Sequence, residues 1–376
     1  MIFAVIVLAM LVGTLTSCDS VEGIVNDIMN EDFIQNIING KDNNANTNNT
    51  ENTGNNNTNQ VDETEAKYNA AIALIEDGKY EEAYEAFKAL GDYKDSEQYL
   101  AKFTYLPTVV TYVLSGRSGV MNVTFGKFNL PSQIISDGDA GKRDGTYTYD
   151  DQGNLMRQEM KYNGDVMMYD YSYDEYNRHI GAVYTHNGVE THSYEYIYND
   201  LGQIVKVIYS EEGGYTEESI YNYSDDSQNY TEYLYIINGV TVCAYTYTHN
   251  EDGNVTSEHL EDYTGGYYYT INYIYDIFGK LIQEIYTDAE QQLVANYTYD
   301  AAGNCIKAEC LYPNGTSHVL TKEYDAHGNV IKEVQISADG EVKSVETQYT
   351  LLYIPIDVPE STMLNINSIL FVTTDY

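Results

Sequence analysis

Apolar and polar residues alternate along most of the chain from residue 146 onwards, and short polar turns interrupt the alternation at regular intervals. One interval reads Tyr147-Thr148-Tyr149-Asp150, and its two tyrosines fall on one face of a strand because alternate side chains point the same way. The second tyrosine defines a register that returns about every 25 residues. The register positions are Tyr149, Tyr173, Tyr198, Tyr223, His249, Tyr275, Tyr299, Tyr324 and Tyr349. This period predicts one hairpin unit repeated many times, with function spread over an extended surface.

Two turns interrupt each unit. Asp or Asn follows most register residues, and such side chains accept hydrogen bonds from backbone N–H groups two residues on. Four residues after the register position, most copies have Gly and one has Asn177, which is the pattern of a site with positive φ. The second turn is often Asn-Gly, a signal of two-residue hairpins. These pairs begin at Asn163, Asn187, Asn238 and Asn314. We therefore expect an antiparallel meander of about 16 strands, which must coil, spiral or curl because neighbouring strands twist.

The recurring Tyr-Asp-x-x-Gly-Asn resembles the YD repeats of Rhs and teneurin-like proteins over roughly residues 146–354. The resemblance implies a mainly all-β fold in which antiparallel hairpins build a coiled or spiralling sheet. Family members that enclose a toxin carry many more repeats and a long C-terminal toxin domain, whereas a tail of residues 355–376 follows the repeats here. Three roles stay open: a binding or adhesion module, a structural spacer, or a reduced relative of a toxin shell that partners a separate effector.

The N-terminus carries a signal for export. Residues 1–17 begin with an uncharged apolar run and end with small residues, which is typical of a signal peptide and too short for a membrane span. Leu15-Thr16-Ser17-Cys18 resembles a bacterial lipobox, and the resemblance implies an extracytoplasmic protein anchored to the cell membrane through lipidated Cys18. The alternative is an ordinary cleaved signal with an incidental cysteine. The first basic residue is Lys41, although signal peptides usually begin with a basic region.

The composition changes several times between the lipobox and the repeats. Residues 18–40 have apolar positions at helical spacing, which predicts a short amphipathic helix that lies on the bilayer or docks on the protein. Asn and Thr dominate residues 41–63, as in a disordered tether. Residues 64–105 resemble a tetratricopeptide repeat and predict a small helical cap against the first strands. Residues 106–145 are expected to form an N-terminal β cap that closes the edge of the sheet.

Charge and side-chain chemistry narrow the possible partners. The chain has 58 acidic and 19 basic residues, and the net charge of −39 argues against nucleic acid and anionic lipid headgroups. Asp137–Gly141 hints at a calcium loop but lacks the ligand spacing of an EF-hand, and His186 and His192 flank a turn with no third ligand in view. The five-residue separation of Cys305 and Cys310 predicts opposite strand faces. We expect neither a metal nor a cofactor.

The sequence shows no recognisable catalytic motif, so we expect a protein that is not an enzyme. Its distinctive feature is 41 tyrosines with no tryptophan. The two regular tyrosine columns predict a packing ladder. Tyr267, Tyr268 and Tyr269 fall outside those columns and alternate faces, and we take Tyr267 and Tyr269 as a possible outward ligand platform. A glycan or cell-wall polymer is the expected ligand, because a tyrosine ring stacks on sugars and also offers a hydroxyl.

Overall fold

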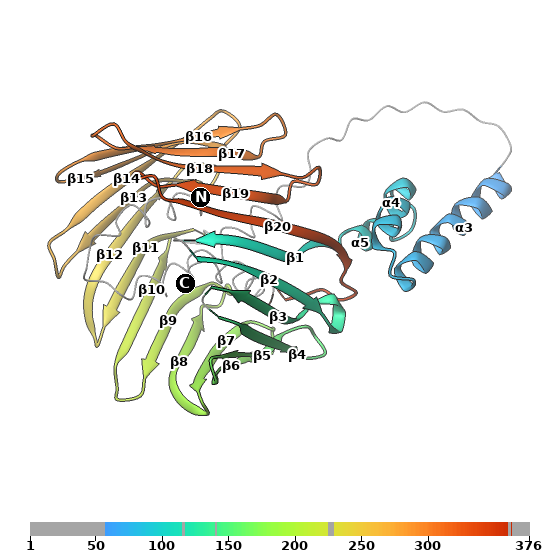
Figure 1. Cartoon of the computed structure of the whole chain (residues 1–376), viewed down its shortest axis with the longest axis horizontal. Helices are drawn as coiled ribbons and strands as arrows, with labels where there is room; N and C mark the ends of the chain where they lie inside the picture. Colours follow the sequence, from blue (N-terminus) through green and yellow to red (C-terminus); the bar gives the residue numbers. More distant parts are fainter. Residues whose placement is uncertain (1–56, 115–116, 140, 225–228, 360–361, 363–376) are drawn as a thin grey trace.

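The computed structural model describes residues 57–114, 117–139, 141–224, 229–359 and 362. These residues form one sheet of twenty antiparallel strands with three helices beside it (Figure 1). The first ten strands are β1 (Phe103–Leu114), β2 (Arg117–Phe125), β3 (Pro131–Gly138), β4 (Arg143–Tyr149), β5 (Leu155–Tyr162), β6 (Asp165–Tyr173), β7 (His179–His186), β8 (Val189–Tyr198), β9 (Ile204–Glu211) and β10 (Thr216–Tyr223). The other ten are β11 (Tyr230–Ile237), β12 (Val240–His249), β13 (Val255–Asp262), β14 (Tyr268–Tyr275), β15 (Leu281–Asp288), β16 (Gln292–Tyr299), β17 (Cys305–Leu311), β18 (Ser317–Tyr324), β19 (Val330–Ile336) and β20 (Val342–Tyr353).

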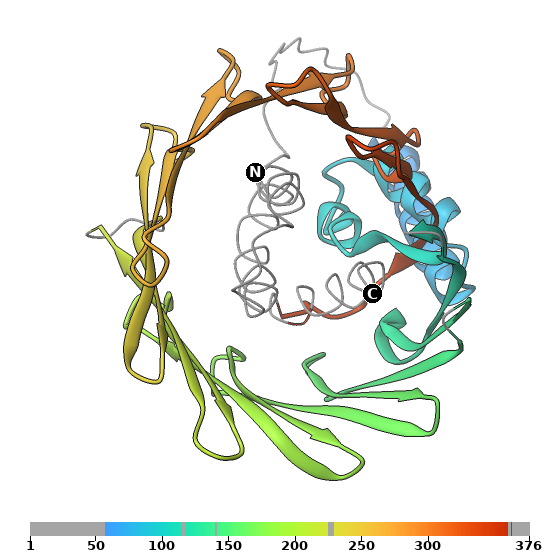
Figure 2. The same cartoon turned by 60° about the vertical axis from the view of Figure 1, so that its left-hand side comes forward.

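The sheet closes into a barrel, so the expected spiral is wrong (Figure 2). Each strand pairs with the next along the chain, and β20 returns to pair with β1 from Phe103 opposite Tyr353 to Val113 opposite Ser344. Closure gives both outer strands a partner and removes the two open edges that a spiral would leave. The segment 106–145, expected to cap an edge, supplies most of β1 to β4 within the same wall. The all-β, antiparallel hairpin architecture predicted from the sequence is confirmed.

The turn chemistry is largely as predicted. At the Tyr-Asp turns the side chain accepts backbone N–H groups, as when Asp276 Oδ1 accepts from Phe278 and Lys280 at 2.8 and 2.9 Å. Positive φ occurs at the recurring glycines and at Asn177, where it is 61°. At three Asn-Gly pairs both residues have positive φ, as a two-residue type I′ turn requires. The fourth differs: the turn at Asn314 is wider, and Tyr312 N–H donates to Thr316 O at 3.0 Å.

The register tyrosines tie neighbouring strands together. Tyr299 at the end of β16 donates its hydroxyl to Leu281 O, at the start of β15, at 2.7 Å. The accepting residue lies beside a bulge, because Ile274 pairs with Gln283 but Tyr275 pairs with Leu281. The same bond, at 2.7–2.9 Å, recurs for Tyr149, Tyr173, Tyr198, Tyr223, Tyr275 and Tyr324. These hydrogen bonds add to the packing ladder that the sequence predicts. The hydroxyls satisfy carbonyls next to irregularities in the sheet.

Three α-helices precede the barrel, namely α3 (Asn57–Glu76), α4 (Tyr80–Leu90) and α5 (Ser96–Leu100). Residues 57–63 are therefore helical, so the tether expected over residues 41–63 is wrong for that part. Their own small core includes Phe87, which is fully buried and stacks on Tyr99 with ring centroids 4.5 Å apart. Tyr99 in turn stacks on Tyr353 of β20, and Tyr84 meets Phe103 of β1 edge-on. The helical segment thus docks where the first and last strands meet. No helix among the described residues has the length and apolar character needed to cross a bilayer.

The two ends of the barrel differ. The Tyr-Asp turns, such as residues 276–280, lie at the end where β20 finishes and the helices dock, and we call this end the anchored rim. The opposite end carries the Asn-Gly turns and their equivalents, such as residues 187–188 and 337–341, and we call it the hairpin rim. Any ligand site at the hairpin rim therefore lies at the opposite end of the barrel from the docked helices.

Candidate ligand-binding surface on the inner wall

One face of the wall is buried and the other is exposed. On β14, Ile271 and Tyr273 are 1% and 6% exposed, whereas Tyr268 and Ile274 are 50% and 39% exposed. None of the described elements lies over most of the outside of the barrel (Figure 2), so the buried face is the inner one. The outer face carries charged pairs across strands, such as Arg157 with Asp170 at 2.6 Å and Lys332 with Glu346 at 2.9 Å.

The predicted outward platform of Tyr267 and Tyr269 is wrong in its orientation. Tyr269 lies on the inner face with its hydroxyl donated to Glu258 Oε1 at 2.9 Å, and Tyr267 is half-buried with its hydroxyl on that of Tyr286. Tyr268, between them, is the ring that points outward. The strand alternation was correctly read, but the sequence does not reveal which of its two faces lines the barrel.

A different group of rings forms a continuous surface on the inner wall. We define the aromatic cluster as Tyr169, Tyr184, His192, Tyr194, Tyr209 and Tyr215, contributed by β6 to β9 and the following turn. Tyr184 stacks on His192 at 4.4 Å, and His192 lies 5.2 Å from Tyr209. All six rings are half-buried, unlike the fully buried tyrosines of β11, so their faces keep some exposure.

Acidic side chains border the aromatic cluster. Tyr209 donates its hydroxyl to Glu211 at 2.6 Å, and Tyr215 donates to Glu217 at 2.7 Å. Partial burial lowers the pKa of His192, although the charge of Glu211 acts in the opposite direction, so the imidazole is neutral at pH 7. An acid-bordered surface of tyrosine rings combines apolar ring faces with hydrogen-bond acceptors. That combination suits a neutral polyhydroxylated ligand and disfavours an anionic one.

A second inner-wall feature is a pair of buried glutamates. Glu284 of β15 is 2% exposed and faces Tyr273 of β14 across the strands, and Glu258 of β13 is 7% exposed on the other side of that tyrosine. Burial raises the pKa of Glu258 to about 7, against hydrogen bonds from Tyr269 and Tyr273. Burial likewise raises the pKa of Glu284 to about 8, slightly offset by the nearby Tyr297. Both groups can therefore be protonated near neutral pH, and Glu284 Oε1 has no hydrogen-bond partner within the described residues.

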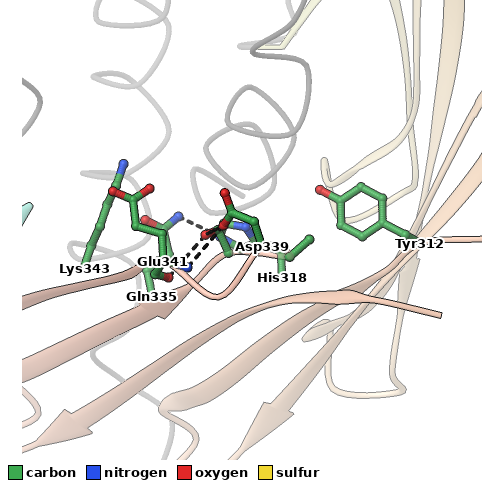
Figure 3. Close-up of a pocket in the computed structure, with 8 residues that line it drawn as sticks. Tyr312, His318, Gln335, Asp339, Glu341 and Lys343 are labelled. Carbon is green, nitrogen blue, oxygen red and sulfur yellow. Dashed lines mark hydrogen bonds between the residues drawn. The ribbon is translucent and has the colours of Figure 1, made fainter. Parts of the chain in front are cut away.

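A cavity of about 330 Å³ opens at the hairpin rim between the last strands (Figure 3). His318 of β18 and Gln335 of β19 lie at its base, while Tyr312 and Lys343 stand at opposite ends of the group. The other lining residues are Ser337, Ala338, Asp339 and Glu341, from the turn between β19 and β20. The lining is mainly polar and contains both charge signs.

His318 is the buried polar group of this cavity, being 5% exposed. Its Nε2 lies 2.8 Å from Gln335 Nε2, and with the amide donating, the imidazole proton sits on Nδ1. Burial and the neighbouring Lys343 charge lower the pKa of His318, with Asp339 opposing, so the ring is neutral at pH 7. Sequence reasoning missed this cavity, because its residues come from three strands and two turns and share no motif.

The remaining candidates from the sequence do not assemble into a site. His186 lies 3.4 Å from Asp165, whereas His192 belongs to the aromatic cluster, so the two histidines are not brought together as ligands. Asp139 accepts from Ser118 N–H and hydroxyl at 2.7 and 2.9 Å. Within the described ranges no group of three or more His, Cys, Asp or Glu side chains is placed to hold a metal ion. The lipidation candidate Cys18 lies outside the described residues.

The cysteines of β17 correct one further expectation. Cys305 and Cys310 both pack on the inner-face core, although their five-residue separation predicted opposite faces. The reason is a bulge: Thr298 pairs with Lys307 but Tyr299 pairs with Cys305, which leaves Ile306 as an extra residue. Burial raises the pKa of the Cys310 thiol to about 11, which makes it a core side chain and not a nucleophile.

Comparison with known proteins assigns no family to the chain. No protein-family model matches it, and no curated protein matches it. Among solved structures, a porin-like protein from Bacteroides uniformis is 13% identical, covering 65% of this chain and 96% of that one, with a TM-score of 0.31. The Tc holotoxin pore of Photorhabdus luminescens is 13% identical, covering 58% of this chain and 15% of that one, with a TM-score of 0.25. A porin-like protein from Bacteroides vulgatus is 9% identical, covering 65% of this chain and 98% of that one, with a TM-score of 0.24.

Proposed function

We propose that the protein is an extracytoplasmic lipoprotein that binds a glycan or cell-wall polymer without catalysing a reaction. In this proposal Cys18 carries the lipid, the part of the expected tether 41–63 that precedes α3 acts as the tether, and the barrel presents its inner wall to the ligand. The observation that carries the binding role is the aromatic cluster, whose stacked, half-buried rings lie beside Glu211 and Glu217. Rings of this kind can cover the apolar faces of successive sugars while the carboxylates accept their hydroxyl protons.

The charge of the outer wall supports a barrel that stands in water beside the membrane. A barrel that spans lipid turns apolar side chains outward over a band about 25 Å tall. Here the outer face carries charged pairs in the body of the wall, such as Arg157 with Asp170 and Lys206 with Glu218, both at 2.6 Å. An Arg or Lys side chain on the lipid face at the bilayer midplane costs about 2–4 kcal/mol. A lipid anchor outside the barrel therefore agrees better with this wall than direct insertion.

The arrangement of the two rims supports the same proposal. The helices that follow the tether dock at the anchored rim, whereas the aromatic cluster lies toward the hairpin rim. A barrel held at one end would turn the other end to the medium. The net charge of −39 would exclude anionic polymers and favour neutral or amine-bearing ones.

A glycan array and quantitative titration with the purified protein test this function. We expect Tyr209→Leu, which removes a ring but keeps an apolar side chain, to weaken binding of the best polymer about tenfold. The matched control is Tyr268→Leu on the outer face, which should leave binding unchanged. Circular dichroism and melting curves would verify that both variants fold.

Four results would contradict the proposal. Equal weakening by the two tyrosine variants would exclude the aromatic cluster as the binding surface. An array with no ligand would favour the structural spacer, and co-purification of an effector from intact cells would favour the reduced toxin-shell role. Turnover of any glycan would overturn the non-enzymatic assignment.

A further inference from the structure

The cavity at the hairpin rim is separate from the aromatic cluster. Its residues belong to the turn after β17 and to β18, β19 and β20, whereas the cluster is built from β6 to β9. A volume of about 330 Å³ is at the lower end of the range for small-molecule sites. One ring with a few polar substituents is therefore a ligand of suitable size.

The chemistry of the lining indicates the kind of ring. Gln335 and His318 supply polar nitrogen and oxygen atoms at the base, and Tyr312 supplies an aromatic ring at one end (Figure 3). Ser337 adds a hydroxyl to the lining. Such groups pair with hydroxyls and with the apolar face of a sugar. A purely apolar ligand would form no hydrogen bonds with the polar side chains that make up most of this lining.

The charged side chains of the cavity indicate which substituent the sugar ring would carry. Two carboxylates, Asp339 and Glu341, face one ammonium, Lys343, so the site carries a net charge of about −1 at neutral pH. Asp339 Oδ1 already accepts from the Ser337 hydroxyl at 2.5 Å and from Glu341 N–H at 3.2 Å. Its Oδ2 makes no hydrogen bond within the described residues, so it can accept a proton from an ammonium group.

We propose that this cavity binds an amine-bearing monosaccharide unit, with its ring between Tyr312 and His318 and its ammonium group against Asp339 and Glu341. The site does not depend on the aromatic cluster, and it is tested with a free monosaccharide. Its failure can therefore be distinguished from failure of polymer binding on the cluster. An isolated sugar makes few contacts, so we expect millimolar affinity.

Isothermal titration of the full chain at pH 6.5 with glucosamine, glucose and ethanolamine tests the proposal. Glucosamine should bind about tenfold more tightly than either probe, because glucose lacks the charge-assisted hydrogen bond and ethanolamine lacks the ring. Asp339→Asn should remove most of the preference over glucose. Lys343→Gln should strengthen glucosamine binding, because it removes a like charge.

Asp288→Asn is the matched control. Asp288 occupies the corresponding turn between β15 and β16, where its Oδ1 accepts backbone N–H groups of Glu290 and Gln291 at 2.8 Å each. Asp288→Asn should keep the wild-type preference for glucosamine over glucose. If damage to a turn alone could remove that preference, Asp288→Asn would lose it as well. Equal binding of the three probes, no binding of glucosamine, or an unchanged preference in a folded Asp339→Asn variant would each overturn the proposal.

Discussion

Replacing Glu284 by Gln should stabilise the barrel in alkaline solution. Burial raises the pKa of this carboxyl from 4.5 to about 8, and no cation is positioned to compensate its charge among the described residues. The folded state therefore holds the proton more tightly than the unfolded state. The resulting stabilisation is complete below about pH 4.5, falls as the pH rises, and is lost once the pH passes about 8.

The size of the effect follows from the same shift. Each pKa unit corresponds to about 1.4 kcal/mol, so ionising Glu284 in the barrel costs on the order of 3–5 kcal/mol. A glutamine has nearly the shape of the protonated acid and does not ionise. Glu284→Gln should therefore be within about 1 kcal/mol of wild type at pH 5 and several kcal/mol more stable at pH 9.

Equilibrium urea unfolding at pH 5, 7 and 9 measures this difference directly. The control is Glu261→Gln, an exposed glutamate on β13, which should follow the wild-type pH profile. If wild type and Glu284→Gln lose stability in parallel between pH 5 and 9, then the Glu284 carboxyl is either exposed to water or paired with a cation. The assigned environment of the inner wall would then be wrong.

Three other predictions concern the anchor, the turns and the ladder. Cys18→Ala should abolish incorporation of a labelled fatty acid and release the protein from the membrane fraction; continued labelling would exclude lipidation there. Gly303→Val should destabilise the barrel by about 1–3 kcal/mol, since φ is 95° at this site, while Asn177→Gly should be tolerated in thermal melts. Tyr299→Phe removes the hydroxyl bonded to Leu281 O and should lower the free energy of unfolding in urea by about 1 kcal/mol. An unchanged unfolding midpoint would show that this hydrogen bond does not stabilise the barrel.

The local structure was largely readable from the sequence because it depends on side chains close together in the chain. The Asp276 turn, the positive φ at Asn177 and the ladder of register tyrosines follow from such short-range chemistry. Closure of the sheet into a barrel could not be predicted from the sequence, because the pairing of Phe103 with Tyr353 depends on the number of strands and on their summed twist. Each hairpin has the same local signature in a spiral and in a barrel.

The candidate site was harder to predict than the fold. Strand alternation correctly separated Tyr268 from Tyr267 and Tyr269, but it left open which face lines the barrel. The bulge at Ile306 moved Cys305 and Cys310 onto one face, which a strict period of two cannot anticipate. His318 and Asp339 come together only through the pairing of β18 with β19, so no sequence spacing marks their cavity.

The hydroxyl ladder also bears on how such a chain can change in size. Seven of the eight register tyrosines, such as Tyr324 bonded to Cys305 O at 2.7 Å, reach into the unit just before their own. A duplicated unit would bring its own turn, bulge and acceptor and would leave every existing rung intact. The wall could thus gain or lose strands two at a time by copying whole units, and its circumference would be set by copy number. The seam between Phe103 and Tyr353 is a junction of another kind, and it would have to be preserved through every such change.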